Sequence, residues 1–393
     1  MIEEIKVSNF LSFKNEVVLS FEASKEKNFE DGQVVEVAQG MRLLRLAVIF
    51  GANASGKSNL LKVVDFLRGF WFRAHGNIDE TTGAIPFLLD AETPTKPSHI
   101  ELRFWVENVR YWYVLEIDIH TVLSEKLYFY KSNQPTMLFN RTLEEGRSLI
   151  TFNPMAVKVS SAAQESLTLK CLPNMSVFAA RNQVNMHIPI VDEARGWMRS
   201  CLMPMVTPET QLGAEERAWT DERLRDYLLD FIHKADFNIT GFTTNSEKLP
   251  LFSHTVKNER GTESYLLPSA MQSAGTLRTV GIESAIFDGL LSGSVLAIDE
   301  IEASLHPDLV EFVLQRYLSK KSRSQLIVTT HYDPLLNTVG DLMRRDSIWF
   351  TEKDEEGATS LYSLIEFKGL NRISSFQKAY RNGRFGALPN IRN

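Results

Sequence analysis

The chain has 393 residues, of which 44% are hydrophobic and 23% are charged, so it can build a large core as one domain with a big insertion or as two domains. Its 43 basic and 49 acidic residues give a net charge of −6, which argues against wholesale electrostatic binding to nucleic acid or to an anionic membrane. No leader peptide and no apolar run of membrane-spanning length is visible, so we expect a cytoplasmic protein without a membrane partner.

The first elements predict a strand, a loop and a helix in succession. Apolar and polar residues alternate over 5–10 and again over 16–21, which predicts an antiparallel pair of strands. The apolar run 43–50, interrupted by Arg45, predicts a buried strand that leads into a glycine-rich loop. Residues 59–67 then follow helical spacing, so the loop stands between a strand and a helix.

The middle of the chain changes its pattern twice. Three alternating stretches, 101–106, 111–119 and 125–130, predict an antiparallel sheet rather than crossover helices. Between about 155 and 250 helical spacing prevails, as in 222–232, and this predicts an inserted helical lobe. The lobe shows no sustained heptads, so we do not expect a long coiled-coil arm.

After this lobe the rhythm of a parallel sheet returns, with a strand at 294–298, a helix at 307–318 and a strand at 325–329. The sequence therefore predicts an α/β fold with a mixed sheet, an antiparallel N-terminal subdomain and a helical insertion. Three parts are expected: an N-terminal part with the glycine-rich loop and the antiparallel sheet (1–154), a helical insertion lobe (155–262), and a C-terminal part that completes the same head as the N-terminal one (263–393).

The glycine-rich loop has the pattern GxxxxGK[ST], which average residue usage would produce in about one in a hundred chains of this length. Its glycines let backbone N–H groups converge on phosphates, Lys57 reaches the β- and γ-oxygens, and Ser58 can ligate Mg²⁺. We therefore expect ATP and Mg²⁺ as cofactors. The predicted nucleotide-binding residues here are Gly51, Ala52, Asn53, Ala54, Ser55, Gly56, Lys57, Ser58 and Asn59.

Two carboxylates follow the apolar strand 295–298. Asp299 is predicted to hold Mg²⁺ through its water shell, and Glu300 to orient or deprotonate a water in line with the γ-phosphate. An Asp-Glu pair alone is usually a solvated surface pair. Its place directly after four apolar residues, in a chain that carries a phosphate-binding loop, favours the catalytic interpretation.

Two further segments separate the classes of P-loop protein. His331 follows an apolar strand, which places its imidazole at the carboxyl edge of a sheet, where it can read or stabilise the γ-phosphate. Residues 272–276, QSAGT, precede a helix-like segment, so Ser273, Gly275 and the helix N-terminus can face an anion. Taken alone, a lone histidine is normally structural and such a serine is typical of a helix cap.

In this order the segments resemble the Walker A, signature, Walker B, D-loop and switch-histidine elements of ABC-type ATPases, with SLHP at 304–307 as the D-loop. More closely, IKVSNFLSF, FGANASGKSNLL, IDEIEASLHP, RRDSIWFTEKD and YRNGRFGALP resemble the stand-alone RecF/SMC-like ATPases of the RloA/AbiL kind. The resemblance reaches both termini and is thinnest in the helical lobe. It departs at the signature, where QSAGT stands for LSGGQ, and it assigns no Q-loop glutamine.

The resemblance implies a dimer or larger assembly in which two chains sandwich two MgATP molecules. Lys57, Glu300 and His331 would be the catalytic residues, and Ser273 and Gly275 would face the nucleotide of the other chain. ATP would close the dimer, and hydrolysis or phosphate loss would reopen it.

Family members commonly occur in bacterial anti-phage and abortive-infection systems beside a separate effector gene. The implied function is therefore a sensor or regulatory ATPase that controls a toxic effector such as a nuclease. Related overcoming-lysogenization-defect nucleases carry a TOPRIM domain after the ATPase, but only 62 residues follow His331 here, which is too few for that fold. A nuclease, TOPRIM-like or otherwise, is thus expected as a partner.

Other functions stay open. A RecF/SMC-like DNA-maintenance ATPase predicts turnover stimulated by DNA without an effector, and an ATP-latched assembly scaffold predicts almost no turnover. The segment 367–393 has no acidic residue and interleaves Tyr380 and Phe385 with basic residues, so it either meets nucleic acid or an acidic partner, or packs across the core as an ordered tail. Its basic residues are Lys368, Arg372, Lys378, Arg381, Arg384 and Arg392.

Overall fold

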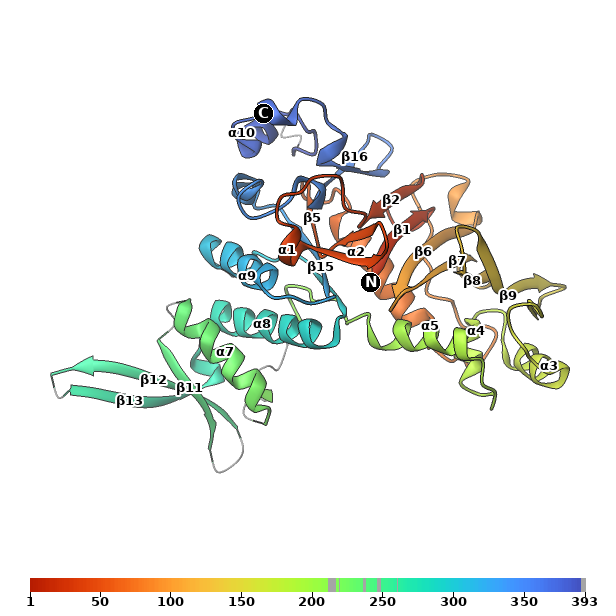
Figure 1. The fold of residues 1–393 in the computed structure, drawn as a ribbon, viewed down its shortest axis with the longest axis horizontal. Coiled ribbons are helices and arrows are strands. Elements are labelled where there is room, and N and C mark those ends of the chain that lie inside the picture. Colours follow the sequence, from red (N-terminus) through yellow and green to blue (C-terminus); the bar gives the residue numbers. More distant parts are fainter. Residues whose placement is uncertain (211–216, 219, 236–237, 246–248, 260, 390–393) are drawn as a thin grey trace.

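The computed structural model describes residues 1–210, 217–218, 220–235, 238–245, 249–259 and 261–389 (Figure 1). Its centre is a five-stranded sheet in the order β14-β15-β5-β16-β17, in which β17 alone runs antiparallel to its neighbour. The predicted mixed sheet is thus confirmed. The strands are β5 (Leu46–Phe50), β14 (Val295–Ile298), β15 (Gln325–Thr330), β16 (Ile348–Lys353) and β17 (Thr359–Ser363).

A seven-stranded antiparallel sheet forms the N-terminal subdomain, in the order β10-β9-β8-β7-β6-β1-β2. The expected pairing at the start of the chain is confirmed, with Ile5 opposite Leu19. The three alternating stretches are its strands β6 to β8, while β9 and β10 were not predicted. The strands are β1 (Ile2–Ser8), β2 (Val17–Ser20), β6 (Ser98–Val106), β7 (Val109–Ile117), β8 (Val122–Tyr130), β9 (Pro135–Glu144) and β10 (Arg147–Phe152).

Strand β5 is buried on both faces, which explains its unbroken apolar run. Ala47 and Ile49 pack into a cluster shared with the antiparallel sheet, whereas Leu46, Val48 and Phe50 pack into a second cluster on the other face. Helix α2 (Lys57–Phe70) belongs to the first cluster, and the second contains α7 (Glu222–Lys234), α8 (Ala274–Ser292), α9 (Pro307–Ser319) and α10 (Phe376–Arg381).

The predicted single strand 43–50 is two strands divided at Arg45. Strand β4 (Met41–Leu44) pairs with β3 (Val34–Ala38), beside a short helical turn α1 (Glu30–Gln33), and β5 begins after the arginine. The Arg45 side chain is buried, donates to the backbone oxygens of Lys320 and Ser324, and lies 4.6 Å from the ring centre of Tyr317. A buried guanidinium needs such partners, and they fix the chain between the two strands.

The segment expected to be a helical lobe is only partly helical. Its first helices, α3 (Ser161–Lys170), α4 (Val177–Arg181) and α5 (Pro189–Ser200), pack into the cluster of the antiparallel sheet. Later it forms a three-stranded sheet of β11 (Ile239–Thr244), β12 (Pro250–Asn258) and β13 (Gly261–Pro268), so the helical prediction was wrong there. Residues 251–256 and 262–267 do not alternate polar and apolar side chains, and most of β12 and β13 is not buried, so neither strand carries the two-residue period of a half-buried strand.

The three-stranded sheet projects from the body of the molecule beside α7 and α8 (Figure 1). Strand β13 leads through the short turn Ser269–Met271 directly into α8. Within the described ranges, no helix combines the length and the apolar character that crossing a bilayer requires.

Candidate nucleotide-binding site

The loop between β5 and α2 needs glycine at both ends of its motif. A Cβ on Gly51 would lie 2.5 Å from the hydroxyl oxygens of Ser55 and Thr351. Gly56 has a φ of 103°, and a Cβ there would lie 2.3 Å from Thr359 Oγ1. Glycine alone meets both requirements without strain, so the loop is shaped for the close approach of a ligand to its backbone.

Strands β16 and β17 support this loop through hydroxyl groups. Thr351 Oγ1 lies 2.7 Å from Ser55 Oγ, and Thr359 Oγ1 donates to the backbone oxygen of Ser55 at 2.9 Å. Ser12 joins the same network, since its hydroxyl oxygen lies 2.9 Å from Thr359 Oγ1 and accepts from Asn59 Nδ2 at 2.8 Å. No sequence pattern marks these supports, because threonine is common in any strand.

Lys57 turns into the loop at the start of α2. Its Nζ donates to the backbone oxygens of Gly51 and Ala52 at 2.8 and 3.0 Å. Burial lowers the pKa of Lys57, although the nearby carboxylates of Glu302 and Glu300 act in the opposite direction. An anion in the loop would offer this amine stronger acceptors than the two carbonyls.

The predicted magnesium ligands come together. Ser58 Oγ donates to Asp299 Oδ1 at 3.0 Å, and Thr329 Oγ1 donates to the same oxygen at 2.5 Å. Hydroxyl and carboxylate oxygens are ligands that Mg²⁺ accepts. Among the residues that the structure describes, no three or more His, Cys, Asp or Glu side chains form a metal cage. Ser58 and Asp299 therefore fit a Mg²⁺ whose other ligands are phosphate oxygens and water.

Glu300 faces the loop from the tip of β14. Its φ of 47° lies in the left-handed region, and its backbone N–H donates to Thr329 Oγ1 at 2.9 Å. A glutamate seldom adopts this conformation unless its surroundings impose it, and such positions gather at functional sites. Thr329 thus holds the carboxylate of Asp299 and the backbone of Glu300, a role that the sequence did not reveal.

His331 lies beside Glu300 and is oriented by Glu302. Its Nδ1 is 3.0 Å from Glu302 Oε1, and its backbone N–H donates to the same oxygen at 2.7 Å. The Glu302 side chain is mostly buried, so the ring has a fixed partner. Sequence reasoning found the histidine from its place after a strand but did not assign Glu302.

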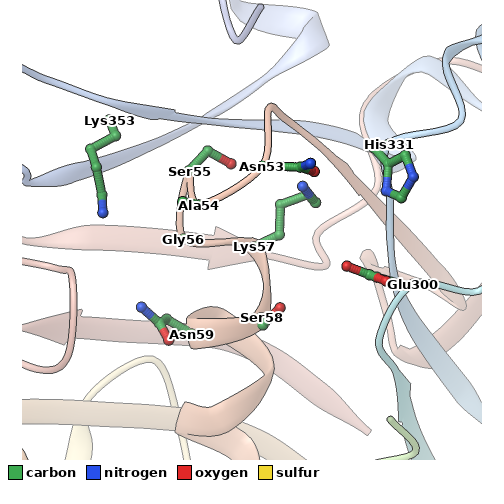
Figure 2. Close-up of a pocket in the computed structure, with 10 residues that line it drawn as sticks. All are labelled: Asn53, Ala54, Ser55, Gly56, Lys57, Ser58, Asn59, Glu300, His331 and Lys353. Atoms are coloured by element: carbon green, nitrogen blue, oxygen red, sulfur yellow. The ribbon is translucent and has the colours of Figure 1, made fainter. Parts of the chain in front are cut away.

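One pocket of about 470 Å³ brings the loop, the carboxylate and the histidine together (Figure 2). It also includes Lys353, which the sequence analysis did not predict as a site residue. The lining residues are Asn53, Ala54, Ser55, Gly56, Lys57, Ser58, Asn59, Glu300, His331 and Lys353.

The predicted signature residues do not line this pocket. Ser273 caps α8, and its hydroxyl oxygen accepts from the backbone N–H of Thr276 at 3.0 Å, which confirms the helix-cap interpretation. A Cβ on Gly275 would lie 2.5 Å from the backbone oxygen of Ser304, so the glycine lets the SLHP segment pass close to the helix start. The QSAGT and SLHP segments of one chain therefore lie next to each other.

The C-terminal segment packs across the core. Tyr380 and Phe385 are buried, which agrees with the second of the two interpretations, an ordered tail that packs across the core. Arg381 forms two hydrogen bonds with Asp333, at 2.5 and 2.9 Å, and so is already paired with a carboxylate. Arg392 lies outside the described residues.

The sequence profile of a protein family covers the segment that contains the loop and the segment that contains the Asp-Glu pair and His331. The family is described as an AAA domain, putative AbiEii toxin, type IV TA system, and its profile matches residues 46–154 and 191–337, more than half of the chain. The chain belongs to this family. As a member of this AAA-domain family, it is a P-loop ATPase of the AAA/ABC type. The matched segments contain the loop, Ser273, the Asp-Glu pair and His331, while Lys353 lies beyond them.

Several solved structures are similar in architecture. An SMC head domain from Thermotoga maritima is 14% identical with a TM-score of 0.43, and the match covers 92% of this chain and 98% of that one. An Smc head bound to the C-winged helix domain of ScpA is 13% identical, with a TM-score of 0.44 and 96% and 99% coverage. An Smc head with an extended coiled coil, bound to the C-terminal domain of ScpA from Pyrococcus furiosus, is 12% identical, with a TM-score of 0.42 and 98% coverage of both chains. Likenesses at this level bear on neither activity nor partners.

A search of curated proteins gave no significant match.

Proposed function

We propose that this protein binds ATP with Mg²⁺ in the pocket of Figure 2 and hydrolyses it to ADP and phosphate. The observation that carries the proposal is the convergence of a phosphate-binding loop, the Ser58–Asp299 pair and Glu300, which come from distant parts of the chain. The family supports a nucleotide as the ligand.

The proposal gives the loop, the metal pair, Glu300 and His331 distinct roles. The loop backbone and Lys57 hold the β- and γ-phosphates, and Ser58 and Asp299 hold the metal. A bound Mg²⁺ would neutralise phosphate charge and orient the γ-phosphate. Glu300 orients the attacking water and accepts its proton, while His331 contacts the γ-phosphate from the side of β15.

The active site is shared between two chains in the same proposal. Ser273 and Gly275 lie outside their own chain's pocket, yet Ser273 is exposed at the N-terminus of the 19-residue helix α8. A helix N-terminus attracts anions, and the γ-phosphate of a second chain is the anion that a two-fold dimer would bring there. Bound ATP would then hold two chains together, and hydrolysis would release them.

The biological setting that we propose is anti-phage defence of the RloA/AbiL kind, in which the ATPase controls a separate toxic effector. The family description, which names a putative toxin and a toxin–antitoxin system, supports this setting. Control would consist of opening and closing the ATP-bound dimer, with the effector held in one of the two states.

The first test is to purify the Glu300→Gln protein from its native host and identify what accompanies it. This variant should bind ATP but turn it over at least a hundredfold more slowly, because the carboxylate that prepares the water is gone. A protein held by Glu300→Gln and not by Lys57→Ala would support an ATP-gated effector complex. Nucleic acid without any protein would contradict it and support a DNA-maintenance function.

A further inference from the structure

Lys353 is a cation in the nucleotide pocket that none of these roles uses. It is the last residue of β16, and its side chain lines the pocket. Thr351, two residues earlier on the same side of the strand, holds Ser55 of the loop. The Lys353 side chain is exposed, and its amine makes no hydrogen bond or ion pair with any residue that the structure describes. Its amine is therefore available to a ligand.

The alternation of β16 separates two different surroundings. Glu352, the residue before Lys353, lies on the other side of the strand, and its carboxylate accepts from the hydroxyl of Tyr362 at 3.2 Å. The carboxylate of Glu352 therefore points away from Lys353 and does not pair with its amine. Its ε-ammonium faces the loop, where the backbone N–H groups also favour an anion.

The order of the strands gives the pocket a direction. Glu300 follows β14 and His331 follows β15, whereas Lys353 belongs to β16, and β5 with its loop lies between them. Figure 2 agrees, because Lys353 lies on one side of the loop and Glu300 and His331 lie on the other. The pocket therefore has a carboxylate end and a lysine end.

This direction sets the orientation of a bound nucleotide. The γ-phosphate must lie at the carboxylate end, since Glu300 acts on a water that attacks it. The phosphate chain then runs through the loop, past Lys57, and its α-phosphate reaches the end where Asn59 and Lys353 lie. Lys57 and the metal pair Ser58–Asp299 serve the β- and γ-phosphates, so Lys353 is the cation left for the α-phosphate.

We propose that Lys353 binds the α-phosphate of the nucleotide. This inference rests on the proposed function, because it takes the orientation of ATP from the role of Glu300. The contact is to a phosphate that every nucleoside triphosphate carries, so Lys353 strengthens nucleotide binding without selecting the base.

The test measures ATP affinity in the Glu300→Gln protein, where slow turnover leaves binding as the only readout. Adding Lys353→Ala should weaken ATP binding about tenfold, as expected for one charge-assisted hydrogen bond at a solvated site, and should weaken GTP and CTP equally. Lys353→Arg keeps the charge and should restore most of the affinity. Lys62→Ala is the matched control, since Lys62 is an exposed lysine of α2 outside the pocket, and it should have no effect.

The outcomes separate this inference from the function on which it rests. If the Glu300→Gln protein binds no better than a Lys57→Ala protein, the proposed function fails and the inference falls with it. If it binds ATP well and Lys353→Ala leaves the affinity unchanged, only the assignment of Lys353 is overturned. A loss confined to ATP would also overturn it, because it would place Lys353 on the base. Equal losses for the three nucleotides, with rescue by arginine, would support it.

Discussion

Thr329 shows how much of the site depends on a single hydroxyl group. Its Oγ1 donates to Asp299 and accepts from the backbone N–H of Glu300, and the residue is fully buried. One side chain therefore orients the carboxylate of Asp299 and the backbone of Glu300, two residues with different proposed tasks. Small displacements of catalytic groups cost large factors in rate, so the geometry of the Asp-Glu pair should be sensitive to this position.

Replacing Thr329 with valine keeps the shape and removes the hydroxyl. We expect kcat for ATP hydrolysis to fall about tenfold to a hundredfold, with little change in ATP affinity, because the loop and Lys57 are untouched. Serine at the same position should restore much of kcat. Steady-state ATPase kinetics that separate kcat from KM check this, and an unchanged kcat in Thr329→Val would remove Thr329 from the mechanism.

The buried Glu283 should make the stability of the folded chain depend on pH. It lies in α8, where its Oε2 is 3.3 Å from Arg316 Nε, with Tyr227 and Asp230 of α7 packed around the same guanidinium. Burial raises the pKa of Glu283 to about 7, although Arg316 acts against this. The folded chain therefore binds this proton more tightly than the unfolded chain, whose carboxyl has its ordinary pKa of 4.5.

Because the pKa of Glu283 is higher in the folded chain, the folded state becomes less stable as pH rises. As pH rises from about 4.5 to 7, the unfolded chain loses the proton first, so the folded state loses up to a few kcal/mol of stability. Glu283→Gln has no proton to lose, and its melting temperature relative to the unmodified protein should rise between pH 5 and pH 8. Thermal unfolding of both proteins across this range measures the difference. Parallel curves would contradict the prediction.

At the scale of elements, the hairpin of β16 and β17 determines the shape of the phosphate-binding loop. Thr351 and Thr359 contact Ser55 from outside, and Thr359 also fills the space beside Gly56. The loop is thus preorganised by strands that follow it by about 300 residues. A ligand then binds without first ordering the loop, so the binding free energy is not reduced by the cost of ordering it.

This contact predicts opposite outcomes for two glycine substitutions in the same region. Gly56→Ala places a Cβ 2.3 Å from Thr359 Oγ1 at a φ of 103°, so we expect nucleotide affinity to fall more than about a hundredfold. Gly69→Ala, near the end of α2, meets no atom within 4 Å and should leave affinity intact while slightly stabilising the helix. Titration with a fluorescent ATP analogue compares them, and equal affinities would show that the hairpin does not constrain the loop.

The elements that sequence could predict are those whose signal is local. The loop, the Asp-Glu pair and His331 each follow an apolar strand directly, so motif and strand support one another. Thr329, Thr351 and Glu302 could not be found in this way, because their importance comes from contacts between distant segments. The three-stranded sheet was missed for another reason, since β12 and β13 are largely exposed and no alternation of polar and apolar residues marks them.

At the scale of the whole molecule, the predicted signature residues Ser273 and Gly275 do not line the pocket of their own chain. Two chains related by a two-fold axis would complete two equal sites. The proposal of a shared site therefore makes a claim about assembly that mixing of variants can test.

Lys57→Ala chains alone should be inactive, because they lack the lysine that binds the phosphates. Ser273→Arg chains alone should also be inactive, because the bulky side chain covers the N-terminus of α8. Mixed dimers contain one intact site, which pairs the loop of one chain with the signature of the other. An equal mixture should recover about a quarter of the ATPase activity. Failure to recover activity in a mixture that forms mixed dimers would show that the signature does not act across chains.

Strand order also decides when during biosynthesis the protein can first bind a nucleotide. Strand β5 lies at the centre of its sheet, yet its neighbour β15 follows it by about 280 residues, with Leu46 opposite Leu326, and β16 comes later still. At about 5–20 residues per second a ribosome needs roughly fifteen seconds to a minute to cover that interval, during which the loop emerges without its flanking strands. The nascent chain therefore carries the phosphate-binding motif long before it carries a nucleotide site, and ATP can act on this protein only once β15 and β16 have been made and the sheet has closed around β5.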